Sequence, residues 1–133
     1  MAARLRKRAA VVDPAAVRLV GVSLDCADPH LLADFYREPV GGRQLWAKEF
    51  SVGLEVAGGL LVAQRVLAYV PPVWPGTSRV HLDFTADDID SAAARAVALG
   101  ATLPQQPDPR WRVLFDSAGH PFCLTPFTPH PAS

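Results

Sequence analysis

Residues 24–42 read LDCADPHLLADFYREPVGG, and residues 82–100, which align with them without a gap, read LDFTADDIDSAAARAVALG. Each stretch starts within a strand of alternating apolar and polar residues, continues through an acidic helix cap, and ends its helix at a glycine. The order of strand, cap, helix and glycine therefore occurs twice in one small chain. Two such units predict two half-sheets that face each other, with a small-ligand cleft between them.

The residues that follow each repeat complete it as a βαβββ unit. In the first unit we expect a strand over 17–26, a helix that begins at Pro29, and strands over 43–47, 50–56 and 60–66. In the second unit we expect a strand from 79, a helix over 91–99 capped by Asp87 or Asp88, and strands over 101–103, 111–115 and 122–125. The predicted fold is α+β, with two βαβββ units forming a curved mixed sheet around one cleft.

The 133 residues suffice for one domain with a substantial core. We expect this domain over 17–127, with units 17–66 and 79–127 joined by a proline-rich linker over 67–78. The basic segment 1–16 is predicted to be a mobile tail, because blocks of like charge repel and stay solvated. Residues 128–133 are predicted to form a second tail.

Charge and hydropathy argue against several partners. The first eight residues hold four of the thirteen basic side chains, so the rest of the chain carries nine basic against thirteen acidic residues. We therefore expect no nucleic-acid partner, which would require a basic face on the folded domain. No apolar run reaches membrane-spanning length, so we expect no membrane partner. Cys26 and Cys123 both lie in apolar strand segments, which is typical of free thiols in the reducing cytoplasm.

The repeated unit, together with LDCADP at 24–29, VHLD at 80–83 and WRVLFDSAGHPFCL at 111–124, resembles the glyoxalase-like branch of the vicinal oxygen chelate superfamily. That superfamily includes glyoxalase I, extradiol dioxygenases, epimerases, fosfomycin-resistance thiol transferases and bleomycin-sequestering proteins. The resemblance covers about residues 17 to 127 and implies the glyoxalase-like fold and a homodimer. It implies no single activity, because the fold hosts many chemistries.

In metal-using members, the ligands come from the first and last strands of each unit. The corresponding positions here are Gly21 or Ser23, Gln64, His81 and Cys123. Only His81 is a strong ligand for a hard or borderline divalent ion, because Gln64 is neutral and the Cys123 thiol is soft and would have to lose its proton. We therefore expect a metal-free cleft with no cofactor. If Zn, Ni, Fe or Mn is bound, His81, Gln64 and Cys123 are its expected ligands.

Strand alternation predicts which side chains line the cleft. One face of each strand is covered by helices, so polar residues at alternate positions should point to the other face. Leu24, Leu82 and Leu124 should pack beneath the helices. The expected cleft residues are Ser23, Asp25, Gln64, His81, Asp83, Trp111 and Cys123. Trp74 lies in the linker, where it is predicted to cover the cleft or to pack at a dimer interface.

Three functions are compatible with these residues. The first is metal-independent binding of a small, partly apolar or aromatic metabolite or drug, as in the bleomycin-sequestering members. The second is a metal-dependent lyase, isomerase or dioxygenase that uses His81 and Gln64. The third is an accessory or dimerisation module without chemistry. The catalytic residues of an enzyme of this kind are not assigned by the sequence.

Overall fold

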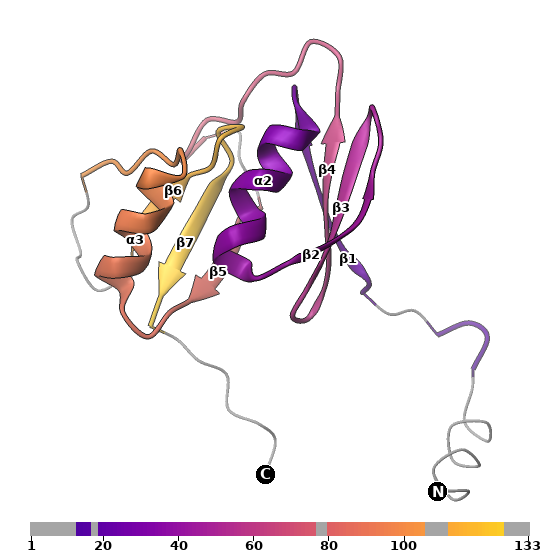
Figure 1. Ribbon diagram of the computed structural model, residues 1–133, viewed down its shortest axis with the longest axis horizontal. Helices are drawn as coiled ribbons and strands as arrows, with labels where there is room; N and C mark the ends of the chain where they lie inside the picture. The colour runs from indigo at the N-terminus through magenta and orange to yellow at the C-terminus, as the bar shows by residue number, and fades with distance from the viewer. Residues whose placement is uncertain (1–12, 17–18, 77–79, 106–111, 127–133) are drawn as a thin grey trace, which may run out of the picture.

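The computed structural model of the protein describes residues 13–16, 19–76, 80–105 and 112–126. It contains two successive units of strands and one helix each (Figure 1). The first unit consists of β1 (Gly21–Cys26), α2 (Pro29–Val40), β2 (Arg43–Ala47), β3 (Ser51–Val56) and β4 (Gly59–Arg65). The second unit consists of β5 (Leu82–Thr85), α3 (Ile89–Ala98), β6 (Arg112–Phe115) and β7 (Pro121–Thr125).

The two units have the same strand order. In the first sheet the order is β1-β4-β3-β2, with β1 parallel to β4 and the other pairs antiparallel. In the second sheet the order is β5-β7-β6, with β5 parallel to β7 and β6 antiparallel to β7. A single bridge from Thr102 to Phe115 occupies the place that β2 has in the first sheet. The predicted α+β fold of two βαβββ units is confirmed.

The strand starts differ from those predicted. Within the described residues, β1 begins at Gly21, where its parallel pairing with Leu60 starts. Residues 17 and 18, with which the predicted strand begins, lie outside the described residues. β5 begins at Leu82, the partner of Phe122, so His81 lies just before the strand. The strand expected over 101–103 is reduced to the bridge at Thr102. In each case the strand spans only residues that pair regularly with a neighbouring strand, whereas the alternation of apolar and polar residues extends further along the chain.

Both helices have N-caps that the sequence predicts, although α3 spans Ile89–Ala98 and so begins two residues before the predicted range. The Asp28 side chain accepts hydrogen bonds from the backbone N–H groups of His30 and Leu31, and Pro29 occupies the first turn. Gly41 ends α2 with φ 65°, a left-handed conformation that glycine adopts without strain. Of the two candidate caps for α3, Asp88 is the one that accepts from the Ser91 N–H.

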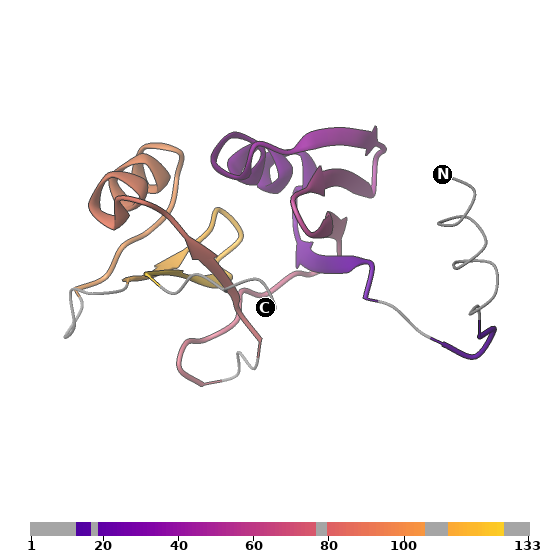
Figure 2. The same cartoon turned by 90° about the horizontal axis from the view of Figure 1, so that it is seen from below.

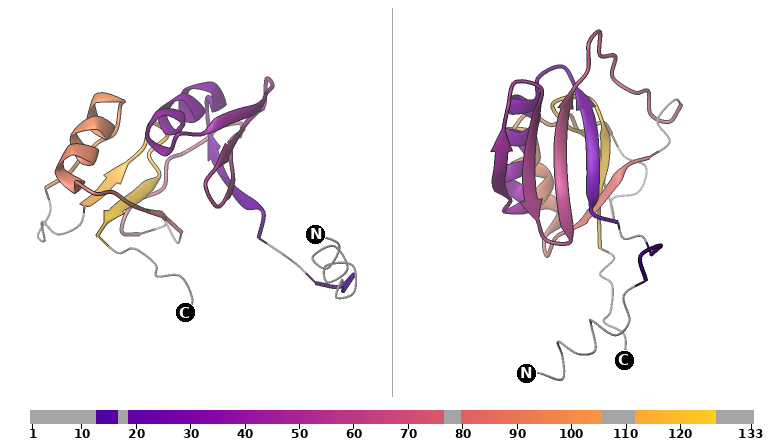
Figure 3. Two further views of the ribbon diagram at one scale, coloured as in Figure 1. Left: turned by 60° about the horizontal axis from the view of Figure 1, so that its bottom comes forward. Right: turned by 90° about the vertical axis from the view of Figure 1, so that its right-hand side faces the viewer.

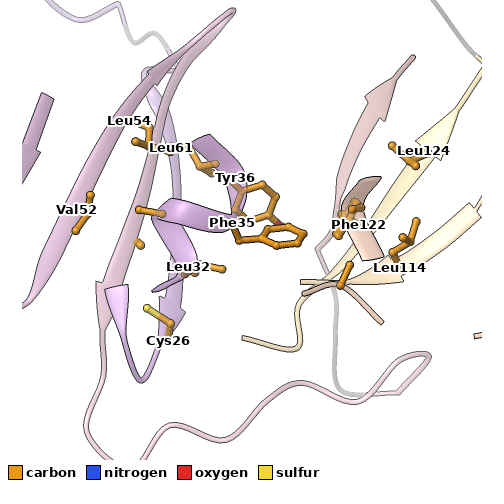
Figure 4. Close-up of a cluster of buried hydrophobic side chains, with 14 of the residues drawn as sticks. Cys26, Leu32, Phe35, Tyr36, Val52, Leu54, Leu61, Leu114, Phe122 and Leu124 are labelled. Atoms are coloured by element: carbon orange, nitrogen blue, oxygen red, sulfur yellow. The ribbon is translucent and has the colours of Figure 1, made fainter. Parts of the chain in front are cut away.

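Helix α2 lies between the two sheets (Figure 2). It packs on β3 and β4 of its own sheet, and its Phe35 and Tyr36 rings contact the second sheet. The ring centroids of Phe35 and Tyr36 lie 5.9 and 6.0 Å from that of Phe122. Figure 4 shows this cluster, with Leu32 and Leu54 on one side of the helix and Leu114 and Leu124 on the other.

The face of each sheet that points away from the helices is called its outer face below. Because α2 packs against the inner faces of both sheets, the two outer faces point in different directions and do not face each other within the chain (Figures 2 and 3). The residue alternation is as predicted: Leu24 and Leu82 pack on the core and Leu124 is buried in it, while Asp25 and Asp83 are exposed. Within the described residues, no helix is long and apolar enough to cross a membrane.

Candidate functional site

Three potential ligand atoms meet on the outer face of the second sheet. Asp83 of β5 and Cys123 of β7 are register partners, and His81 precedes Asp83 by two residues on the same face. The His81 Nδ1 atom lies 3.0 Å from Asp83 Oδ1 and 3.8 Å from Cys123 Sγ. These three atoms all lie within 4.8 Å of one another. The structure therefore brings together three of the predicted site residues.

The linker adds an aromatic ring to this cluster. Trp74 packs edge to face with His81, with ring centroids 5.1 Å apart and an interplanar angle of 84°. Both rings are half-buried, so the indole shields part of the cluster from water and leaves part of it accessible. Trp74 therefore contacts the predicted site from within its own chain.

The Cys123 thiol is protonated at neutral pH. Burial and, after it, the negative charge of Asp83 raise the pKa of Cys123 to about 11. A neutral thiol is a poor nucleophile, because the thiolate is the reactive species. Cys123 therefore acts as a compact, weakly polar part of the wall unless a bound cation displaces its proton.

The outer face of the first sheet carries the other predicted residues. Asp25 of β1 and Gln64 of β4 are register partners, and Ser23 lies two residues before Asp25 on the same face. Ser23 and Asp25 are exposed, and Gln64 is half-buried. This surface offers hydroxyl, carboxylate and amide groups to a ligand.

Trp46 forms an aromatic platform on the same outer face. A Cβ atom added to Gly53 would lie 2.4 Å from two carbons of the Trp46 ring, so the indole rests directly on the glycine backbone. The Trp46 Nε1–H group donates a hydrogen bond to Ser51 Oγ at 2.8 Å, which fixes the ring. Trp46 was not among the cleft residues expected from the sequence. In the sequence, Gly53 was the signal for this contact, because a glycine inside a strand marks a place where another group approaches the backbone closely. It lies between the buried residues Val52 and Leu54.

The two outer faces do not meet within the chain. Asp25 lies in the first sheet and Asp83 in the second, and α2 lies between the two sheets. The structure thus divides the predicted residues into one group around Gln64 and another around His81. Trp111, the remaining predicted residue, lies outside the described residues.

His120 connects the two units through a side-chain hydrogen bond. Its Nε2–H group donates to the Asp25 carbonyl oxygen at 2.5 Å. Tyr69, from the linker, donates its hydroxyl hydrogen to the Ala118 carbonyl oxygen at 2.7 Å, and its ring packs 5.9 Å from that of His120. His120 therefore links β1 of the first unit to the turn that precedes β7.

The His81, Asp83 and Cys123 donor set fits a zinc ion in type. Zinc accepts imidazole nitrogen, carboxylate oxygen and thiolate sulfur at about 2.0–2.3 Å, which places ligand atoms about 3–4 Å apart. The observed separations of 3.0 and 3.8 Å agree with this spacing. The direct contact of His81 with Asp83 also satisfies both groups without an ion. His81 and Asp83 therefore satisfy each other when no metal is bound. Together with Cys123, they also offer three atoms of the kinds that zinc binds.

Comparison with known proteins identifies the family. The model of the Glyoxalase-like domain matches residues 21–125, which covers both units and the linker. The chain belongs to the Glyoxalase-like domain family of the vicinal oxygen chelate superfamily. Among curated proteins, none matches the chain.

Solved structures share the fold at low sequence identity. A glyoxalase/bleomycin resistance protein/dioxygenase family enzyme from Burkholderia phytofirmans PsJN is 18% identical with a TM-score of 0.66, covering 81% of this chain and 97% of that one. A mutant of the fosfomycin resistance protein FosX from Listeria monocytogenes, complexed with Mn(II) and 1S,2S-dihydroxypropylphosphonic acid, is 16% identical with a TM-score of 0.67, covering 85% and 92%. TioX from Micromonospora sp. ML1 is 23% identical with a TM-score of 0.57, covering 81% and 97%.

Proposed function

We propose that this glyoxalase-like protein binds a small, partly aromatic or apolar molecule in a cleft shared between two copies of the chain. The proposal rests on one observation. Each outer face presents an aromatic ring beside polar side chains, and α2 lies between the two sheets. Trp46 lies on one face with Gln64, and Trp74 lies on the other with His81. In a homodimer, the first unit of one copy would stand opposite the second unit of its partner.

The chemistry of these faces suits a planar ligand. The exposed side of the Trp46 indole offers a stacking surface, and the Trp74 and His81 rings offer an aromatic edge opposite it. Gln64 and Asp83 would fix the orientation of polar substituents through hydrogen bonds. Binding needs no metal in this proposal, because His81 and Asp83 already satisfy each other and the Cys123 thiol is protonated.

Exposed apolar residues support the homodimer. Leu67, Val70 and Val73 of the linker have exposed fractions of 80%, 79% and 61%. Several large apolar side chains exposed in one short segment favour contact with a partner surface. The free thiols, Cys26 and Cys123, support a reducing location such as the cytoplasm.

Subunit complementation tests the shared cleft. Trp46→Ala and His81→Ala variants are each expected to lose the thermal shift that a small-molecule library hit produces in the wild type. If the cleft is shared, mixing the two variants restores binding at one of the two sites of each heterodimer, because that cleft receives both native residues. If each cleft lies within one chain, every cleft of the heterodimer keeps one defect and mixing restores nothing.

A second candidate function is a metal-dependent lyase, isomerase or dioxygenase. It is favoured by the convergence of His81, Asp83 and Cys123 within 4.8 Å. Gln64, the other predicted ligand, would then come from the partner copy, since it lies on the outer face of the first sheet. Asp83 supplies the carboxylate that the sequence prediction lacked.

Metal content separates the two candidates. The protein would be purified without chelator and its Zn, Ni, Fe and Mn measured by mass spectrometry. Near-stoichiometric metal that is lost in His81→Ala but retained in His30→Ala would favour the metal enzyme; His30 is an exposed histidine bonded to the Lys48 carbonyl. A metal-free dimer that responds to a ligand supports the binding protein. A metal-free dimer without any ligand response would indicate the accessory module.

A further inference from the structure

A groove separate from both outer faces lies between the two helices. It has a volume of ≈ 570 Å³ and is bounded by α2, α3, β5, β7 and the end of β3. Figure 1 shows the arrangement of the elements that bound it, with β7 between α2 and α3. This is the helix side of the second sheet, opposite the side on which His81 and Cys123 lie. The volume falls within the range of about 300–1,000 Å³ that is typical of small-molecule sites.

The groove is lined mainly by apolar side chains and has a rigid aromatic floor. Among the described residues that line it, Asp83 and Arg95 carry charge. Asp83 turns its carboxylate toward His81 on the outer face, which leaves Arg95 as the charged group of the groove. The Tyr36 ring lies 6.0 Å from the Phe84 and Phe122 rings, and its hydroxyl is anchored to buried Asp116. Tyr36 and Phe122 are buried, so half-buried Phe84 is the ring that a ligand can contact. Because its buried neighbours hold it in place, Phe84 binds a flat ring without first having to be organised.

An ion pair beside the groove joins the two helices. Arg95 of α3 donates its Nε–H to Glu38 Oε1 of α2 at 2.8 Å, and its Nη2 lies 2.5 Å from the same oxygen. The two side chains are 67% and 43% exposed, so the pair adds little to stability and can exchange. Arg95 therefore has an intramolecular carboxylate partner that another carboxylate of similar geometry can replace.

We infer that this groove is a second ligand site, for an aromatic monocarboxylate whose ring contacts Phe84, which the buried Tyr36 and Phe122 rings support, and whose carboxylate replaces Glu38 on Arg95. The apolar walls select the ring, and the guanidinium selects the anion. Glu38 acts as a built-in competitor, since ligand and Glu38 bind the same donors. The site is independent of the shared cleft and does not require a second copy of the chain.

Titration calorimetry with 1-naphthoate as the probe and neutral 1-naphthalenemethanol as the comparison tests this inference. Arg95→Met is expected to weaken naphthoate binding on the order of tenfold and to leave the alcohol almost unaffected. Glu38→Gln is expected to strengthen naphthoate binding several-fold, because it removes the competing carboxylate. Partial unfolding would weaken binding in both variants, so it cannot explain weaker binding in Arg95→Met together with stronger binding in Glu38→Gln. Circular dichroism would check independently that both variants are folded.

Matched controls use the same chemistry elsewhere on the surface. Arg37→Met removes a cation that pairs with Asp34, and Glu55→Gln removes a carboxylate that pairs with Arg43; both are expected to leave naphthoate binding unchanged. Ala92→Phe, which fills the groove, is expected to abolish binding.

Three results would overturn the inference. The first is the absence of naphthoate binding to the wild-type protein at millimolar concentration. The second is equal affinity in Arg95→Met and the wild type. The third is binding that survives Ala92→Phe but is lost in Trp46→Ala, which would assign the probe to the shared cleft. If the proposal of a shared cleft is wrong, subunit complementation between Trp46→Ala and His81→Ala would fail, and this result is independent of naphthoate binding.

Discussion

Replacing Tyr36 with phenylalanine should destabilise the protein, although it removes only one oxygen atom. The Tyr36 side chain is 2% exposed, and its hydroxyl donates to Asp116 Oδ2 at 2.6 Å. Asp116 is 4% exposed, and its Oδ1 atom accepts from the N–H groups of Ala118 and His120. The variant leaves Oδ2 buried without this donor. A buried acceptor that loses its partner costs about 1–3 kcal/mol of unfolding free energy, and a charged one lies at the upper end.

The loss should be larger at neutral than at acid pH. Burial raises the pKa of Asp116, and the Tyr36 hydrogen bond counteracts that rise. An acid whose folded pKa lies above its unfolded value of about 3.9 binds its proton more tightly in the native state, so its ionisation reduces stability as pH rises through the folded pKa. Tyr36→Phe raises the folded pKa further and therefore increases that reduction. Below the unfolded pKa, Asp116 is protonated in both states and the charged part of the cost disappears.

Urea unfolding at pH 7.0 and pH 3.5, followed by circular dichroism at one protein concentration, measures both effects. Asp116→Asn provides the control, because the neutral amide should make the Tyr36→Phe cost independent of pH. Equal stability of wild type and Tyr36→Phe at pH 7.0 would refute the reasoning. So would a larger loss at pH 3.5 than at pH 7.0.

Three further outcomes follow from the packing. Gly53→Val should displace the indole of Trp46, seen as a shifted tryptophan emission maximum, because the new side chain occupies the ring position; an unchanged emission spectrum would contradict the stacked geometry. Leu54→Ala, at a site 1% exposed, should cost about 2–5 kcal/mol, and half-buried Leu24→Ala should cost less; the reverse order in urea unfolding would place Leu24 deeper than described. In a variant lacking the other cysteine, the rate of Cys123 alkylation should rise with pH toward about 11, and a plateau near pH 8.5 would indicate an unshifted thiol.

The sequence predicted the features that local rules determine. The alternation around Leu24 places Asp25 on the opposite face because successive strand residues point to opposite sides. Asp28 caps its helix because its side chain reaches N–H groups two and three residues away. These interactions span a few residues, so their pattern is visible in the chain itself. The repeated βαβββ order follows from them.

Contacts between the units were not predictable in the same way. The Tyr36 hydroxyl and Asp116 are 80 residues apart, and Asp116 fits a turn just as well as a buried acceptor. The Arg95–Glu38 pair joins two helices whose charged faces each look solvated in the sequence. In both pairs, the sequence around one residue gives no sign of its partner, because the contact depends on how the two sheets are oriented about α2.

The division of the site between two outer faces has the same origin. Strand alternation puts Gln64 and His81 on outer faces whether those faces meet within one chain or across two. Which faces meet is decided by α2, whose Leu32 packs toward its own sheet while Phe35 and Tyr36 extend to the other sheet. A helix with one narrow apolar stripe would cover a single sheet and leave the two sheets free to close around a cleft. The wider apolar surface of α2 occupies the space between the sheets, and a shared cleft then requires a second copy.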